Sequence, residues 1–138
     1  SAFNDMIDSN PLMTFSHVLR ELNRFHLAYA HLITTTEDDL WHGAAPVALL
    51  GLRQEFKGPV IVANGFNHEM ATWALTEGEA DAVAFGRLFL ANPDLPERFR
   101  LDAPLNTPDE LTFYGGTEKG YTDYPTFVPH LAHEKKHV

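Results

Sequence analysis

The chain contains 138 residues, of which 44% are hydrophobic and 12% aromatic, and this composition suffices for one globular domain with an apolar core. Its formal net charge of −9 argues against a surface for nucleic acid or anionic membrane, because such surfaces require clustered Lys and Arg. The lack of cysteine excludes a disulfide framework and a thiolate metal site, and no apolar run reaches about 18 residues, so we expect a soluble, cytoplasmic protein.

The first predicted element is an amphipathic helix over residues 14–25, with the sequence TFSHVLRELNRF, and Thr14 is expected to cap it. Four apolar residues at helical spacing predict its buried face: Phe15, Val18, Leu19 and Leu22. Residues 27–34 form a short β-rich run, and the polar residues 34–45 predict a loop after this strand.

A second helix and two further strands are predicted before residue 87. Pro46 suits a first helical turn and Gly58 suits the residue just past a helix end. Three segments follow as strand, helix and strand: PVIVAN (59–64), NHEMATWALTEG (67–78) and ADAVAFG (80–86). Asn67 can cap this third helix and Gly78 can end it.

Alternation of helices with apolar strands predicts an α/β fold, with a parallel sheet built of right-handed βαβ units and covered on both faces. The segment LFLANPDLPERF after Arg87 is helical in parts, with breaks at Pro93 and Pro96. Residues 103–129 are rich in Pro, Gly, Thr and Asp, which is typical of an ordered surface arm.

Two of the predicted strands end in glycine-containing turns, at Gly65 and at Gly86. Ligands of parallel α/β folds bind beyond the carboxyl ends of the strands, and glycine lets backbone N–H groups approach an anion closely. Arg87 adds a fork of donors that can bind phosphate oxygens. The pattern therefore indicates a phosphate site, with the alternative that both glycines only form tight turns and Arg87 pairs with a surface carboxylate.

Four sequence blocks, spanning residues 3–127, resemble the C-terminal part of the old yellow enzyme family of FMN-dependent ene-reductases: FNDMIDSNP, GPVIVANGF, DAVAFGRLFLANPDLPERF and GYTDYPTF. The resemblance implies a (β/α)₈ TIM barrel, in which LAYAHLI, VIVAN and AVAFG are strands 6, 7 and 8. Residues 1–102 would then be a partial TIM barrel and residues 103–138 a C-terminal arm and tail.

The resemblance also implies roles for individual residues. Asn64 and Gly65 match the pair that binds the FMN phosphate after strand 7, and Gly86 and Arg87 match the pair after strand 8. Tyr121 matches an aromatic position of the C-terminal arm near the flavin. The family usually has Gly-Gly or Gly-Asn after strand 7, so the order Asn-Gly leaves open which residue adopts the unusual backbone angle.

The same resemblance places the flavin-ring contacts, the carbonyl-binding His/Asn pair and a tyrosine proton donor in strands 1 to 5, and this chain lacks those motifs. No catalytic residue is therefore assigned to it. Three strands cannot close an eight-stranded barrel, so the chain is expected to be a fragment, one piece of a split enzyme or a truncated relative.

Three functions remain open. The parent protein is expected to be an FMN-dependent NAD(P)H oxidoreductase that reduces activated alkenes, with this chain supplying the phosphate-binding part. The chain could instead be a non-catalytic module that binds FMN or another phosphorylated ligand. In a third interpretation it is structural and assembles with the N-terminal half of a barrel or with itself.

Two further motifs carry competing interpretations. Trp41 follows the first strand, and the resemblance implies that it covers a substrate pocket, whereas an ordinary surface Trp is equally compatible with the sequence. HEKKH at 133–137 fits the H-E-x-x-H zinc pattern, but no apolar helix surrounds it and no third ligand follows it, so we expect a solvated tail and no metal site.

Overall fold

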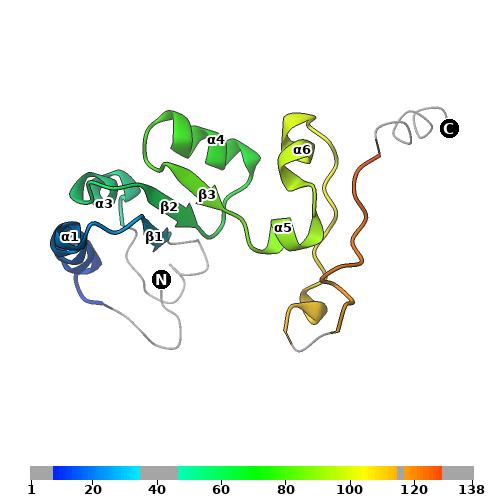
Figure 1. Ribbon diagram of the computed structural model, residues 1–138, viewed down its shortest axis with the longest axis horizontal. Coiled ribbons are helices and arrows are strands. Elements are labelled where there is room, and N and C mark those ends of the chain that lie inside the picture. The colour runs from blue at the N-terminus through cyan, green and yellow to red at the C-terminus, as the bar shows by residue number, and fades with distance from the viewer. Residues whose placement is uncertain (1–7, 35–46, 115–116, 129–138) are drawn as a thin grey trace. The chain divides into compact units, whose positions relative to one another are not determined.

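The computed structural model describes residues 8–34, 47–114 and 117–128, which fall into two compact units, residues 1–85 and 86–138. The first unit contains the larger set of elements: α1 (Pro11–Leu22), η1 (Asn23–Phe25), β1 (Ala30–Ile33), α3 (Leu49–Glu55), β2 (Val60–Ala63), α4 (His68–Thr76) and β3 (Ala82–Ala84) (Figure 1). The second unit contains α5 (Arg87–Ala91), α6 (Leu95–Arg100) and η2 (Glu110–Thr112). No helix in these ranges has both the length and the apolar character that crossing a membrane requires.

The three strands form one parallel sheet in the order β1-β2-β3. Ala30 pairs with Val60 at the start of β2, and Ile33 pairs with Ala63 at its end. Ala63 also pairs with Ala84, the last residue of β3. The predicted parallel α/β arrangement is therefore confirmed, and all three strands end at the same edge of the sheet.

One face of this sheet forms the core of the first unit. Val60 and Val62 are fully buried and pack with Leu19 of α1 and Leu52 of α3. Ile33 occupies the opposite face and is 58% exposed. Figure 1 shows α1, α3 and α4 along the same side of the strands. Within the described ranges the helices thus cover one face of the sheet, and not both as predicted.

The reason for the one-sided cover lies in the strand order. Each strand pairs with the next one along the chain, so the connections never reverse direction, and right-handed crossovers then place the connecting helices α3 and α4 on the same side. A doubly wound sheet would require a reversal of strand order. The observed arrangement is that of consecutive units of a βα-barrel.

The helix boundaries show which local signals prevailed. Helix α1 begins at Pro11, because the side chain of Asn10 accepts a hydrogen bond from the N–H of Met13 (3.3 Å). The predicted cap at Thr14 is therefore wrong. The predicted cap at Asn67 is confirmed by its hydrogen bond from the N–H of Met70 (2.8 Å).

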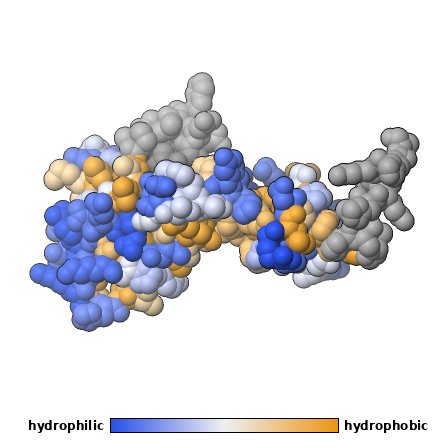
Figure 2. All heavy atoms as spheres, turned by 90° about the horizontal axis from the view of Figure 1, so that it is seen from above, coloured by the Kyte–Doolittle hydropathy of each residue, from blue (hydrophilic) through white to orange (hydrophobic). Residues whose placement is uncertain are grey.

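The predicted buried face of α1 is only partly correct. Leu19 is buried, but Phe15 and Val18 are 45% and 43% exposed, and Ser16 is buried in their place. The helix is rotated so that Ser16 and Leu19 lie inward, which leaves the flank with Phe15 and Val18 open. Apolar side chains also reach the surface elsewhere in both units (Figure 2).

The second unit has a different construction. Its described residues after α6 form no strand, as predicted for the arm. The chain breaks between α5 and α6 near Pro93, as predicted, whereas Pro96 lies in the first turn of α6 and does not interrupt it. Its interior contains Ala91 and Leu95 together with two buried polar residues, Asn92 and Arg98.

Candidate functional site

The turn after β2 contains two consecutive residues with left-handed backbone angles. The φ angle is 86° at Asn64 and 76° at Gly65. Both members of the Asn-Gly pair therefore adopt the unusual conformation, which answers the question that the sequence left open. Asn is among the few non-glycine residues that tolerate a positive φ, so this order of residues fits the turn.

A residue that the sequence analysis missed holds this turn. Thr34 follows β1 directly, and its carbonyl oxygen accepts a hydrogen bond from Nδ2 of Asn64 at 2.9 Å. Its hydroxyl lies 3.0 Å from the carbonyl oxygen of Ala63 and 2.9 Å from that of Asn64. The only signal in the sequence was its position at the end of a strand, and that position gains meaning once β1 and β2 are known to pair.

The turn after β3 contains a glycine that the chain's own packing does not require. Gly86 has φ −84°, an angle that any residue adopts. A Cβ atom added at Gly86 would meet no heavy atom within 4 Å. Neither strain nor close packing in the described structure thus accounts for glycine here, and the position leaves room for another molecule to approach the backbone.

Arg87 is the first residue of α5, and its side chain is 69% exposed. Nη1 of Arg87 lies 3.6 Å from Oε1 of Glu110, whose side chain is 74% exposed. The pairing of Arg87 with a surface carboxylate, which was the alternative to a phosphate contact, is therefore present. Such an exposed pair contributes only about 0–1 kcal/mol, so a phosphate could displace the carboxylate.

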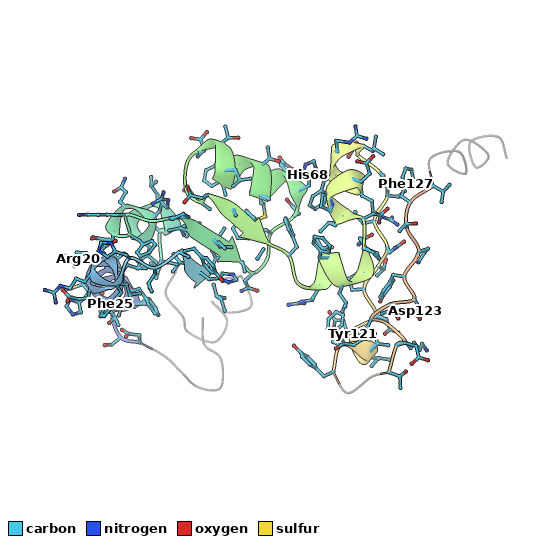
Figure 3. The ribbon with its side chains drawn as sticks, viewed as in Figure 1. Arg20, Phe25, His68, Tyr121, Asp123 and Phe127 are labelled. Carbon is cyan, nitrogen blue, oxygen red and sulfur yellow. The ribbon has the colours of Figure 1, made fainter. Side chains whose placement is uncertain are left out.

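Tyr121 lies in a turn of the C-terminal arm and is 44% exposed (Figure 3). The side chain of Asp123 accepts a hydrogen bond from the N–H of Gly120 (2.7 Å), and the hydroxyl of Tyr121 donates to the carbonyl oxygen of Phe113. The hydroxyl is thus bound within the arm itself, and the aromatic ring is the part of Tyr121 that can contact a ligand.

The predicted site residues fall in both units. Asn64 and Gly65 form one turn of the first unit, while Gly86, Arg87 and Tyr121 belong to the second. Two predictions concern residues outside the described ranges: Trp41 and the HEKKH segment at 133–137.

Comparison with known proteins identifies relatives for most of the chain. Residues 4–106 match the family described as NADH:flavin oxidoreductase / NADH oxidase. The chain is 41% identical over 138 residues to 12-oxophytodienoate reductase 1 of Oryza sativa subsp. japonica (97% of this chain, 36% of the relative). It is 43% identical over 121 residues to 12-oxophytodienoate reductase 2 of Arabidopsis thaliana (86% and 32%).

Solved structures give the same result. Morphinone reductase superposes with a TM-score of 0.81 at 43% identity, covering 91% of this chain and 34% of that protein. The old yellow enzyme from Trypanosoma cruzi superposes with a TM-score of 0.85 at 36% identity, covering 93% and 33%. The chain therefore spans about a third of the length of the relatives that it matches.

Proposed function

Because the chain belongs to the NADH:flavin oxidoreductase / NADH oxidase family, we propose that it is one part of an FMN-dependent NAD(P)H oxidoreductase of the old yellow enzyme type. We assign β1, β2 and β3 to strands 6, 7 and 8 of its barrel. The sequential strand order and the helices on one side of the sheet support this assignment.

The specific role that we propose for this chain is to bind the phosphate of FMN. The observation that carries the proposal is the pair of left-handed residues, Asn64 and Gly65, at the carboxyl edge of the sheet. Phosphate sites of TIM barrels are often formed by the loops after strands 7 and 8. Gly86, whose lack of a side chain the described packing does not explain, supports a close approach of phosphate to the second loop.

Arg87 would provide the positive charge of this site. Its guanidinium can form a bidentate contact with phosphate, which is stronger than its exposed contact with Glu110. Binding would then exchange one anionic partner of Arg87 for another. The exchange leaves the carboxylate of Glu110 without Arg87, but this carboxylate is 74% exposed, so water can solvate it.

Bound FMN would supply hydride transfer between NAD(P)H and an activated alkene. The roles that we assign to this chain concern binding: the two turns hold the phosphate, Arg87 neutralises it, and the ring of Tyr121 contacts the flavin. Trp41 remains a prediction for the substrate pocket. We assign the proton donor and the carbonyl-binding pair to the remainder of the barrel, so the isolated chain is expected to be inactive.

The remainder of the barrel is also the partner that we propose for the open face of the sheet. Ile33 is 58% exposed on that face, and burying an Ile side chain stabilises a protein by about 1.5–3 kcal/mol. Self-association of the chain would cover the same surface. Light scattering of the isolated chain tests this proposal, which a monodisperse mass of 15.5 kDa would contradict.

The phosphate assignment can be tested with Arg87→Ala in the complete barrel, meaning this chain together with the remaining strands. Loss of a charge-assisted contact of about 1.5–3 kcal/mol should weaken FMN binding at least about tenfold in a fluorescence titration. Arg100→Ala is the matched control, since Arg100 is also exposed and paired with a carboxylate, that of Glu97. Equal FMN affinity of the Arg87→Ala variant and the wild type would refute the assignment.

A further inference from the structure

The end of β1 and the turn after β2 are joined by reciprocal hydrogen bonds, which we call the Thr34–Asn64 pair. The amide side chain of Asn64 donates to the carbonyl oxygen of Thr34 (2.9 Å). The N–H of Thr34 donates to the carbonyl oxygen of Ala63 (2.9 Å), and the Thr34 hydroxyl lies within 3.0 Å of the carbonyl oxygens of both Ala63 and Asn64. Thr34 and Asn64 are both half-buried.

These contacts determine the direction of the neighbouring amides. In a planar trans peptide the C=O and the following N–H point in opposite directions. Because the carbonyl of Ala63 points toward Thr34, the N–H of Asn64 points away from β1, toward the side of β2 on which β3 lies. Because the carbonyl of Asn64 also points toward Thr34, the N–H of Gly65 points away from β1 as well.

The turn depends on such a constraint. Asn64 has φ 86°, whereas a non-glycine residue ordinarily favours a negative φ. Gly65 has φ 76°, and glycine adopts positive and negative φ about equally readily. Glycine is the most flexible residue, and a non-glycine residue persists at positive φ when its surroundings hold it there. The hydroxyl of Thr34 is the side-chain group that contacts the carbonyl between Asn64 and Gly65.

We propose that Thr34 is a positioning residue for the flavin phosphate: its hydroxyl holds the peptide between Asn64 and Gly65 so that the N–H groups of the turn face the anion. The inference rests on the proposed phosphate site, and it adds to that site the residue that directly follows β1. Thr34 itself does not contact the phosphate. It acts by orienting the backbone of its neighbour.

The test compares FMN with riboflavin, which lacks the phosphate, in the apoprotein of the complete barrel. The quantity measured is the ratio of the two dissociation constants, obtained from quenching of flavin fluorescence. Thr34→Val removes the hydroxyl at nearly constant volume, and Thr34→Ser retains it. We expect Thr34→Val to reduce the preference for FMN about three- to tenfold with unchanged riboflavin affinity, and Thr34→Ser to restore the wild-type ratio.

The possible outcomes separate this inference from the proposed function. If Thr34→Val weakens both flavins equally, or leaves the ratio unchanged while the wild type prefers FMN, Thr34 is only a structural residue and the inference is wrong. If the wild type itself binds riboflavin as tightly as FMN, the phosphate site is wrong and the inference fails with it. If Thr34→Val loses the preference for FMN over riboflavin and Thr34→Ser keeps it, the result supports both the phosphate site and the positioning role of Thr34.

Discussion

The two units of the chain are stabilised by different kinds of interior. In the first unit, the residues packed at the centre are apolar, such as Leu52, Val60 and Val62. In the second unit, the buried residues include the charged side chain of Arg98 and the amide of Asn92. The difference follows from their secondary structure, because a sheet pairs its own backbone, whereas an irregular arm needs side chains to bind its carbonyl groups.

Arg98 binds several segments of the second unit. Its guanidinium contacts Asp94 (Nε to Oδ1, 2.7 Å) and the carbonyl oxygens of Pro104 (2.5 Å) and Pro125 (2.8 Å). Its Cζ atom lies 5.9 Å from the ring centroid of Phe127, which Figure 3 labels. The N–H of Phe127 donates to Asp94 (2.6 Å). One ion pair, in which Arg98 is buried and Asp94 is half-buried, thus joins α6 to two separate parts of the arm.

Asn92 and Asn106 make a second, uncharged connection of the same kind. The side chain of Asn92 accepts from the N–H of Asn106 (2.7 Å), and that of Asn106 donates to the carbonyl oxygens of Ala91 (2.8 Å) and Pro125 (2.9 Å). The arm is therefore held mainly by hydrogen bonds to α5 and α6. Substitutions should consequently affect the two units by different mechanisms.

The largest effect is expected for Arg98→Met. Removing one partner of a buried ion pair leaves the other uncompensated and costs about 3–5 kcal/mol. Asp94 and two carbonyl groups would lose their donor, so residues 104–127 should lose protection in hydrogen exchange while β1 and β2 keep theirs. Arg100→Met, on the exposed side of the same helix, is the control. Unchanged protection of the arm in Arg98→Met would contradict the proposed difference between the units.

The opposite pattern is expected for Leu52→Ala. Leu52 is 7% exposed in the core of the first unit, and truncating a buried Leu costs about 2–5 kcal/mol. Hydrogen exchange at β2 should accelerate, while the arm keeps the protection that Arg98 gives it. Leu50→Ala provides a control on the same helix, since Leu50 is 42% exposed. Comparable losses in the two variants would mean that the apolar cluster is not what stabilises this unit.

Acid should weaken the second unit selectively. Burial raises the pKa of Asp94, but hydrogen bonds from Arg98 and from backbone N–H groups, together with the charge of Arg98, outweigh burial and hold this pKa below its ordinary value of 3.8. A pKa lowered by folding means that the contribution of Asp94 is complete above the unfolded-state pKa and is lost as pH falls through the folded-state pKa. The stability lost at low pH should be at most about 1.5–3 kcal/mol, which is the usual contribution of hydrogen bonds to a charged group.

The measurement is the protection of the arm's backbone amides against hydrogen exchange between about pH 6 and pH 3, corrected for the intrinsic exchange rate at each pH. Asp94→Asn should flatten this profile. Glu97→Gln should leave the profile close to that of the wild type, because the Glu97 carboxylate is exposed, although its hydrogen bond with Arg100 also lowers its pKa. If Glu97→Gln flattens the pH profile and Asp94→Asn does not, the acid sensitivity arises from the exposed carboxylate of Glu97 and not from Asp94.

Sequence patterns predicted the first unit better than the second. The order of helices and strands, the parallel sheet and the cap at Asn67 followed from local signals, and the resemblance to the old yellow enzyme family is confirmed by the family match. The orientation of α1 did not follow, because periodicity identifies an apolar stripe but not the partner that buries it. Phe15 and Val18 belong to that stripe and are exposed.

Arg98, which holds the second unit, and Thr34, which holds the turn after β2, carried little local signal in the sequence. Arg98 lies in the charged segment PERF, which is typical of an exposed helix, and its burial depends on carbonyl groups 6 and 27 residues away. Thr34 gains its role from a contact with a residue 30 positions later. Such roles depend on tertiary contacts, which a single sequence does not reveal.

The smallest effect is expected for the ion pair of the first unit, which is the direct counterpart of Arg98 and Asp94. Nε of Arg20 on α1 lies 3.2 Å from Oε2 of Glu55 on α3, with side-chain exposures of 58% and 32% (Figure 3 labels Arg20). A double-mutant cycle with Arg20→Gln and Glu55→Gln should give a coupling energy of about 0–1 kcal/mol. Salt at about 1 M should remove this coupling, because the Debye length falls to about 3 Å.

The corresponding cycle for Arg98 and Asp94 should keep most of its coupling energy in salt, since the Arg98 and Asp94 side chains are only 3% and 18% exposed. Equal salt sensitivity of the two cycles would show that the pair in the second unit is accessible to solvent ions, and the stability of the arm would then have to come from the hydrogen bonds of Asn92 and Asn106.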